Sequence, residues 1–376
     1  MSKARPLHDA IANTKLKLYR RLYDYEANPA LVQSFDFHKL QHLVLLKFDG
    51  KLGDTEVISG FLTTLKQQCP HLMLSVVCSA VTAELYERYL PCDQVLCSPK
   101  KPNKHTLNKI IAQLKAQGPC DAVLTTEWFC RLRELYTLKK LHPSLHAGLD
   151  GKLKSLNFNL ARRNPHAHVT AFFADLLKAG SLNPALPPYV RFYTEDERLR
   201  MKACLEDKTQ VIGLCPYGAA HARSLSDEAI VQICAQTEEI LPQAHLLLLG
   251  LPDKLKALLQ RTHLDTHERV LLPEQPLRLT KLCALTSCLS ALISVDTANL
   301  HLGCAAQLPV LGIFPDDRRD DPKVLWGLAY NEAKPQVTYY EPGLPIESLS
   351  MEPLLQAVKE FLRELTGELA SQPEAN

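Results

Sequence analysis

The stretch that decides the fold runs from Leu45 to Lys66 and reads "LLKFDGKLGDTEVISGFLTTLK". Its start continues a short apolar run, as a buried strand does, and its second half shows helical spacing that predicts a helix over 55–68. Glycines punctuate the turn between them, which closes on Gly53-Asp54. A strand, a turn and a helix in this order begin a parallel α/β unit. An acid is therefore expected where a strand gives way to a helix.

The same alternation continues along the chain in two series. The first series predicts strands at 42–47, 72–78, 94–97 and 122–125, and helices at 55–68, 81–90 and 106–117. The second predicts strands at 210–215, 245–249, 269–272, 291–295 and 309–314, and helices at 227–240, 252–261, 277–288 and 298–306. Strands that alternate with helices pair in parallel through crossover helices. We therefore predict two Rossmann-like domains in tandem.

Composition shifts divide the chain further. We predict an N-terminal helical arm over 1–40, a first Rossmann-like domain over 41–185, a proline-rich linker over 186–208 and a second Rossmann-like domain over 209–348. A helix over 349–368 is expected to dock back across the first domain, and a disordered tail over 369–376 ends the chain. The arm spaces Leu18 and Leu22 as a helix does, with Lys and Arg between apolar positions. It either packs on the first domain or touches an anionic membrane surface.

Bulk composition narrows the class of protein. Of 376 residues, 46% are hydrophobic and 22% charged, as in a folded soluble protein. No apolar run approaches the roughly 20 residues of a membrane-spanning helix, and the N-terminus does not read as a secretory signal. Twelve cysteines are scattered without a CxxC pair, which indicates reduced, structural thiols. We predict a cytoplasmic protein without a nucleic-acid partner.

Positive charge is concentrated in one stretch although the net charge is only +2. Residues 94–163 hold thirteen Lys and Arg against four Asp and Glu. Such a surface is either a solvated face or a field that gathers an anionic substrate. The candidates for contact with that substrate are Lys51, Lys100, Lys101 and Lys104.

Three segments carry residues suited to chemistry at the carboxyl ends of strands, where open parallel sheets bind ligands. The first is Gly53-Asp54. At the start of a helix, Asp54 is either an N-terminal cap or a carboxylate that acts as general base. The second is "GLCPYGAAHARSLSDE", residues 213–228, in which Gly218 and Ala219 permit close backbone approach and Arg223 could reach a phosphate.

The third segment is "LISVDTANLHLGCAAQLPVLGIF", residues 292–314. A buried strand ends there on Asp296-Thr297 and a helix follows at once. The Thr297 hydroxyl and the first helical amides form an anion cradle, with Asp296 and His301 on the sugar or ribose. The alternative is an ordinary helix cap and a packed histidine. No GxGxxG, Walker or HExxH motif is present, so the usual dinucleotide, P-loop and zinc-protease sites are not indicated.

Together the three segments resemble the family 9 glycosyltransferases, the ADP-heptose:lipopolysaccharide heptosyltransferases. Gly53-Asp54, "PYGAAHAR" and "DTANLHLGCAA" correspond to the family's strand-one turn, second-half opening and Asp-Thr-Gly-x-x-His segment. The chain departs from the family pattern at Ala298, where the family has glycine, and at Arg223, where it has lysine. The first loop is one residue longer, and the usual Gly-Pro-Thr turn after Phe314 is absent.

The resemblance implies a GT-B fold, in which two Rossmann-like domains with parallel sheets face each other across a cleft. It implies inverting transfer of heptose from ADP-heptose, bound in the C-terminal domain, to the lipopolysaccharide inner core, bound in the N-terminal one. Neither a metal nor a cofactor is implied, and the place of action would be the inner face of the inner membrane. Asp54 would be the catalytic base, and acceptor binding would fall to the four lysines named above. The residues implied in donor binding are Gly218, Ala219, Arg223, Asp296, Thr297, Ala298 and His301. A transferase for another nucleotide sugar or acceptor, or a non-catalytic binding protein of the same fold, remains an alternative.

Overall fold

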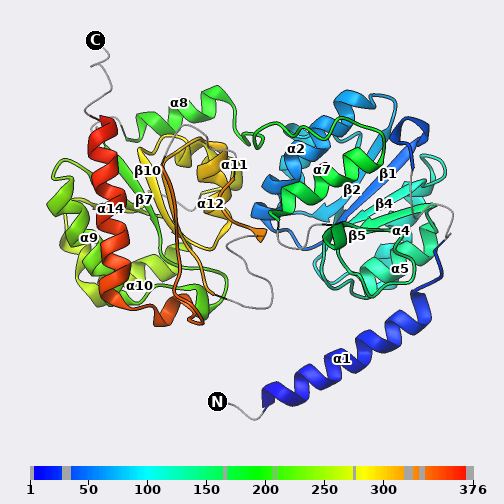
Figure 1. The fold of residues 1–376 in the computed structure, drawn as a ribbon, viewed down its shortest axis with the longest axis horizontal. Coiled ribbons are helices and arrows are strands. Elements are labelled where there is room, and N and C mark those ends of the chain that lie inside the picture. The colour runs from blue at the N-terminus through cyan, green and yellow to red at the C-terminus, as the bar shows by residue number, and fades with distance from the viewer. Residues whose placement is uncertain are drawn as a thin grey trace. The chain divides into compact units, whose positions relative to one another are not determined.

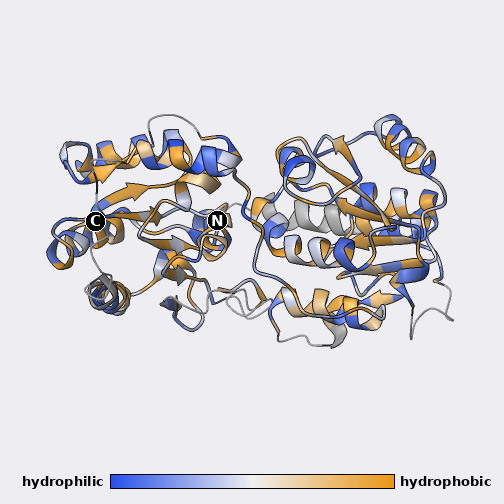
Figure 2. Ribbon diagram, turned by 90° about the horizontal axis from the view of Figure 1, so that it is seen from above, coloured by the Kyte–Doolittle hydropathy of each residue, from blue (hydrophilic) through white to orange (hydrophobic). Residues whose placement is uncertain are grey.

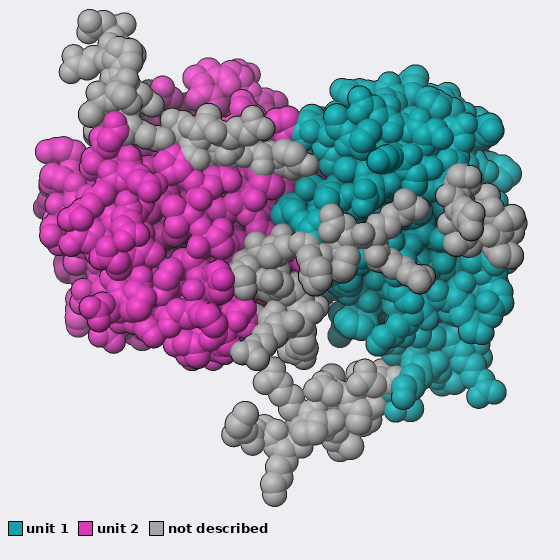
Figure 3. All heavy atoms as spheres, viewed as in Figure 1, with its two compact units in different colours: residues 1–51, 58–187 teal, residues 52–57, 188–376 magenta. Residues whose placement is uncertain are grey.

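A computed structural model describes residues 4–27, 35–163, 167–205, 208, 210–273, 277–316, 325–329 and 335–369, without the side chains of 4–13, 162–163 and 368–369. The chain forms two compact units, one of residues 1–51 and 58–187 and the other of residues 52–57 and 188–376 (Figure 3). The division passes through one helix, whose first six residues belong to the second unit. The predicted tail beyond residue 369 lies outside the described residues.

The first unit is built on a six-stranded sheet in which every described pairing is parallel, with the order β3-β2-β1-β4-β5-β6. The strands are β1 (His42–Lys47), β2 (Met73–Ser79), β3 (Gln94–Ser98), β4 (Ala122–Thr125), β5 (Leu145–Gly148) and β6 (Phe158–Asn159). Every residue of β1 and β4 is buried. A central strand covered on both faces needs continuous apolar sequence rather than alternation, which the run at 43–46 supplies.

Most helices of the first unit cover this sheet (Figures 1 and 2). The helices are α1 (Ala4–Tyr23), η2 (Phe37–Lys39), α2 (Leu52–Gln68), α3 (Ala83–Arg88), α4 (Lys104–Lys115), α5 (Leu132–Leu141), α6 (Leu160–Arg163) and α7 (Val169–Ala179). Of these, α1 lies outside the others, against α5. α4 shows why such segments become helices. The Asn103 side chain caps its first turn by accepting from the Thr106 amide, and its buried residues recur at helical spacing from Leu107 to Leu114.

The second unit repeats this plan with the order β12-β11-β10-β7-β8-β9. Its strands are β7 (Val211–Cys215), β8 (His245–Leu248), β9 (Val270–Leu271), β10 (Ala291–Val295), β11 (Val310–Ile313) and β12 (Gln336–Tyr339). Its helices are α8 (Glu195–Ala203), η3 (His221–Arg223), α9 (Asp227–Ile240), α10 (Pro252–Thr262), η4 (Leu264–Thr266), α11 (Leu279–Thr286), α12 (Ala298–Ala305), η5 (Ile346–Ser348) and α14 (Met351–Leu369).

Alternate residues of β7 enter two different cores of this unit. Ile212 and Leu214 pack with α9, α10 and α14, whereas Val211 and Cys215 pack on the other face with α11 and α12. The helices that follow β7 and β10, α9 and α12, therefore lie on opposite faces of the sheet. In such a sheet the crevice at this reversal point, beyond the carboxyl ends of the strands, is the usual ligand site.

The predicted class of two parallel α/β sheets is confirmed, but three details of the predicted organisation are corrected. The C-terminal helix does not pack in the core of the first unit: the apolar face of α14, including Val358 and Phe361, packs on α9 in the second. The predicted linker contains a helix, α8, which contacts α11. The short strands β5, β6 and β12 were not predicted.

Among the described residues no helix is long and apolar enough to cross a membrane.

Candidate functional site

Asp54 lies in the first turn of α2, because this helix begins at Leu52 and not at Thr55. Lys51 is the N-cap residue and provides no side-chain cap. The Asp54 carboxylate is half-buried. The interpretation of Asp54 as the N-terminal cap of this helix is wrong, because Lys51 occupies that position. The glycine of this loop with left-handed backbone is Gly50, at φ 67°, not Gly53.

Gly53 has a different role, which is close packing between the starts of α2 and α12 within the second unit. A β-carbon at Gly53 would lie 2.8 Å from Cδ2 of His301 and 3.3 Å from the Cα of Ala298. A side chain there would push α2 away from α12. Because Gly53 has no side chain, the start of α12 packs directly against it. This contact places Asp54 near the carboxyl end of β10.

Asp296 and Thr297 follow β10 directly. The Asp296 amide still donates to the Ile313 carbonyl, which continues the sheet ladder by one residue. The Thr297 hydroxyl caps α12 by accepting from the Asn299 amide at 3.2 Å, and it also lies 3.2 Å from the Ser294 hydroxyl. The capping interpretation of Thr297 is thus confirmed, and its hydroxyl has partners in the protein.

Arg223 and Asp296 form an ion pair at the reversal point of the second sheet. Nη1 of Arg223 lies 2.9 Å from Oδ2 of Asp296, and the two side chains are 44% and 11% exposed. Burial raises the pKa of Asp296, the Arg223 guanidinium opposes that rise, and the nearby charge of Asp54 adds to it. The Arg223–Asp296 pair and the nearby Asp54 charge thus lie where the sheet topology predicts a ligand.

Gly218 holds the loop that carries Arg223. The Gly218 amide donates to the Arg223 carbonyl at 2.9 Å, and Tyr217 pairs with Ser224 as an antiparallel bridge. A β-carbon at Gly218 would lie 2.7 Å from that carbonyl oxygen. The close approach that this glycine permits is therefore to its own loop, whereas Ala219 is exposed. The loop fixes the backbone from which Arg223 reaches Asp296.

His301 is buried, at 5% exposed, one turn into α12. Its ring packs edge-on between Tyr189 and Trp326, with centroid distances of 6.1 and 6.5 Å. The packed-histidine interpretation therefore describes its surroundings. Tyr189 and Trp326 were not predicted, since both lie outside the three segments and outside any motif.

The four lysines predicted to bind an acceptor do not share one environment. Lys51 lies 3.1 Å from Asp49, whereas Lys100 and Lys101 are exposed in the turn after β3. Lys104 begins α4, and its ammonium lies 5.8 Å from the ring centroids of both Tyr23 and Tyr136. Lys104 therefore belongs to the surface beside α1, not to the loop that carries the other two.

A charged cluster that sequence reasoning missed lies at the reversal point of the first sheet, after β1 and β4. The Lys47 side chain is fully buried, with Nζ 2.8 Å from Asp49 and 3.5 Å from Glu127. Burial disfavours the charged form of Asp49, but its contacts with Lys47, Glu127 and Lys51 hold its pKa below the usual range. For Glu127, burial is the larger effect and raises the pKa. The buried Lys47 ammonium thus contacts both carboxyl groups. A lysine ending an otherwise apolar strand was the available signal.

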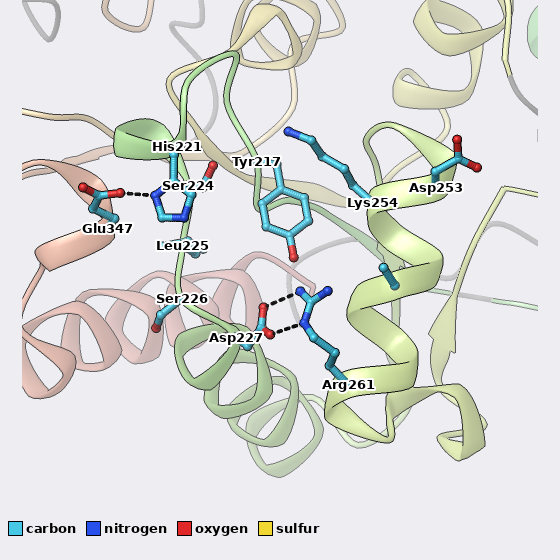
Figure 4. A pocket seen from close by; sticks show the side chains of 11 residues that line it. Tyr217, His221, Ser224, Leu225, Ser226, Asp227, Asp253, Lys254, Arg261 and Glu347 are labelled. Atoms are coloured by element: carbon cyan, nitrogen blue, oxygen red, sulfur yellow. Dashed lines mark hydrogen bonds and ion pairs between the residues drawn. The ribbon is translucent and has the colours of Figure 1, made fainter. Parts of the chain in front are cut away.

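A pocket of about 730 Å³ lies elsewhere in the second unit, between the β7–α9 loop, α10 and η5 (Figure 4). At its floor Arg261 forms a bidentate ion pair with Asp227, in which Nε and Nη2 donate to the two carboxylate oxygens at 2.7 and 3.0 Å. The amino group of Lys254 lies 5.9 Å from the ring centroid of Tyr217 above it. None of the residues predicted to act on a donor lines this pocket.

Among known proteins, only solved structures match this chain. No protein-family model matches the chain, and no curated protein matches it by sequence. Among solved structures, a family 9 glycosyltransferase from Veillonella parvula matches with a TM-score of 0.68 at 15% identity, covering 88% of this chain and 99% of its own. The E. coli heptosyltransferase WaaC with ADP matches at 0.64 and 16%, covering 85% and 99%. E. coli heptosyltransferase II matches at 0.63 and 14%, covering 88% and 100%.

The chain has the GT-B fold of the family 9 glycosyltransferases. The predicted fold is thereby confirmed over the full length of those proteins. At identities of 14–16% the likeness establishes the fold alone.

Proposed function

We propose that the protein is an inverting glycosyltransferase that transfers heptose from ADP-heptose to the inner core of lipopolysaccharide. The observation that carries the proposal is the packing of Gly53 on α12, which brings Asp54 toward the Arg223–Asp296 pair. In this arrangement Asp54 supplies a base and Arg223 supplies positive charge. Two of the structural neighbours were solved with ADP or an ADP-heptose analogue, which supports this donor class.

The proposed reaction is a direct displacement. Asp54 takes the proton of the acceptor hydroxyl, whose oxygen forms the new bond to the anomeric carbon. The bond from that carbon to the diphosphate oxygen breaks, and ADP leaves with the electron pair. Arg223 and the first amides of α12 stabilise the departing charge. Since these groups are cationic or dipolar, the proposal assigns no step to a metal ion.

The remaining predicted residues take supporting roles. Gly218 keeps the Arg223 loop in place, the exposed Ala219 leaves room beside it, and Thr297, Ala298 and His301 shape the start of α12 against the donor. On the acceptor side we assign Lys100 and Lys101, with Lys51 and Lys104 at the margins, to the anionic groups of the core. An acceptor of this kind carries a lipid anchor, which would bring the enzyme to the inner face of the inner membrane.

A donor panel tests the proposal. Purified protein is incubated with ADP-heptose, ADP-glucose and UDP-sugars, with a lipopolysaccharide acceptor lacking the heptose region, in EDTA. Transfer from ADP-heptose, with release of ADP, is expected in EDTA. Transfer only from another nucleotide sugar would favour the second candidate, for which Ala298 in place of the family's glycine is the supporting departure. Absence of transfer from every donor would favour a binding protein.

A further inference from the structure

α1 presents two chemically different faces. Its inner face packs on the first unit through Leu16, Tyr19 and Tyr23. Arg20 on the same side donates to both carboxylate oxygens of the buried Asp150, at 2.9 and 2.7 Å. An ion pair to a buried carboxylate and an edge-on contact of Tyr23 with a core tyrosine fix the orientation of the helix. The opposite face is consequently held outward.

That outward face combines apolar and cationic side chains. Leu18 and Leu22 are 52% and 56% exposed and lie one helical turn apart, so they share a face. Lys15, Lys17 and Arg21 are exposed beside them, and none forms an ion pair with a described residue. From residue 14 to residue 23 there is no acid. We call these five side chains the α1 outer face.

Further cations border the α1 outer face where α1 meets α5 (Figure 1). Lys104 lies over Tyr23 and Tyr136, and Lys140 lies over Tyr136 at 5.8 Å. Lys139 lies over the Tyr25 ring at 5.6 Å. All three lysines are exposed. The positive charge thus continues from the helix onto the body of the first unit.

We propose that the α1 outer face binds the surface of a membrane that contains anionic phospholipids. Exposed leucines between lysines and arginines are the pattern of a helix that lies in the interface, with its apolar side chains among the acyl chains and its cations among the headgroups. A second copy of the chain is a poorer occupant. Pairing two α1 outer faces would bring six cations together without an acid, and like charges at close range repel.

The proposal identifies the surface by which the enzyme would reach a lipid-anchored acceptor, and to that extent it rests on the proposed function. Its test needs neither donor nor acceptor, so the two can fail separately. The full chain is sedimented with vesicles of phosphatidylcholine alone, or of phosphatidylcholine and phosphatidylglycerol at about seven to three. We expect binding to the anionic vesicles only, weakening as salt rises.

Two variants locate the surface. Lys15→Glu/Lys17→Glu should weaken binding at least twenty-fivefold, since each cation near such a surface contributes about fivefold. Leu18→Ser/Leu22→Ser should weaken it at least tenfold at unchanged charge. The matched controls are Leu199→Ser and Lys202→Glu on α8, where Leu199 is 50% exposed and Lys202 is exposed. Neither control should alter binding, and circular dichroism should show that all variants are folded.

Three results would overturn the proposal. One is no binding to anionic vesicles, and another is binding that both α1 variants retain. The third is a wild-type dimer in sedimentation velocity, without vesicles, that Leu18→Ser/Leu22→Ser converts to a monomer. That last result would make a second copy the occupant of the α1 outer face.

Discussion

Single residues decide the geometry of the candidate site, and Gly53 is the clearest example. It is needed because the start of α12 leaves no room for a β-carbon, not because its backbone is unusual. The sequence shows a glycine before an acid at a strand–helix junction, which identifies the position. It does not show what approaches that glycine, because the contact joins segments more than 200 residues apart.

Gly53→Ala should leave a folded protein with little activity. The added methyl group must displace the His301 ring or the Ala298 backbone, at a cost of about 1–3 kcal/mol in stability. Displacing Asp54 by about 1 Å should lower turnover about a hundredfold. Chemical denaturation and initial rates measure the two effects. Gly367→Ala is the control: no atom lies within 4 Å of its β-carbon position in α14, so it should stabilise slightly. Equal rates for Gly53→Ala and wild type would refute the packing argument.

Glu56 predicts a pH dependence of stability. Its carboxyl is fully buried, without a hydrogen-bond partner among the described residues, and burial raises its pKa well above the usual value. A raised pKa in the folded state means that stability is greatest below the unfolded-state pKa, near 4.5, and falls as pH rises. Glu56→Gln should therefore be more stable than wild type at pH 8 and lose that advantage toward pH 4. Urea titrations across this range, with exposed Glu352→Gln as control, should show a gap that widens with pH. A gap independent of pH would contradict the assignment.

At the scale of elements, those with a strong sequence signal could be predicted with their bounds, and those without one could not. β1, β4, β10 and α9 have their predicted bounds because long apolar runs and a clear Ser226 cap define them. β6 has only two residues, and β12 has no fully buried residue, so neither forms a buried apolar run that a pattern could reveal. α2 begins three residues early because Gly53 reads as a turn residue, whereas tertiary contact with α12 favours helix there. The candidate residues at strand ends could be picked out from the sequence. The cluster around Lys47 was missed although its lysine ends an apolar strand, and the ring partners of His301 carry no sequence signal.

The loop between β7 and α9 makes a prediction about donor binding. Arg223→Ala should weaken ADP binding about ten- to a hundredfold, since a charge-assisted contact to the diphosphate is lost. Arg223→Lys should retain most of the affinity. Arg261→Ala is the matched control: it also removes an arginine paired with an aspartate in the same unit, but in the pocket of Figure 4. Isothermal titration with ADP distinguishes them. A greater loss for Arg261→Ala would place the nucleotide in that pocket.

At the scale of the whole molecule, charge is divided between two units of similar plan. The first unit carries the basic stretch 94–163, and the second carries the Arg223–Asp296 pair. If the first gathers an anionic acceptor and the second binds the nucleotide, substitutions in one unit should change one substrate's kinetics and spare the other's.

Lys100→Glu/Lys101→Glu tests that division. The change of four charge units at two exposed positions should raise the acceptor KM about tenfold or more at low salt, and less at high salt. The donor KM should stay the same. Lys202→Glu/Lys256→Glu makes the same change at exposed positions of the second unit and should leave the acceptor KM unaltered. An unchanged acceptor KM in Lys100→Glu/Lys101→Glu at both salt concentrations would make these lysines a solvated surface only.

Turnover by Asp54→Asn with ADP-heptose tests most directly whether the packing of α2 on α12 places Asp54 as the base. The substitution keeps size and removes basicity, so kcat should fall by about 10²–10⁴ while the affinity for ADP stays within a few-fold. Asp253→Asn, an acid of the same unit that lines the other pocket, should keep the wild-type kcat. A kcat for Asp54→Asn within tenfold of wild type would contradict the role of Asp54 and the proposed mechanism with it.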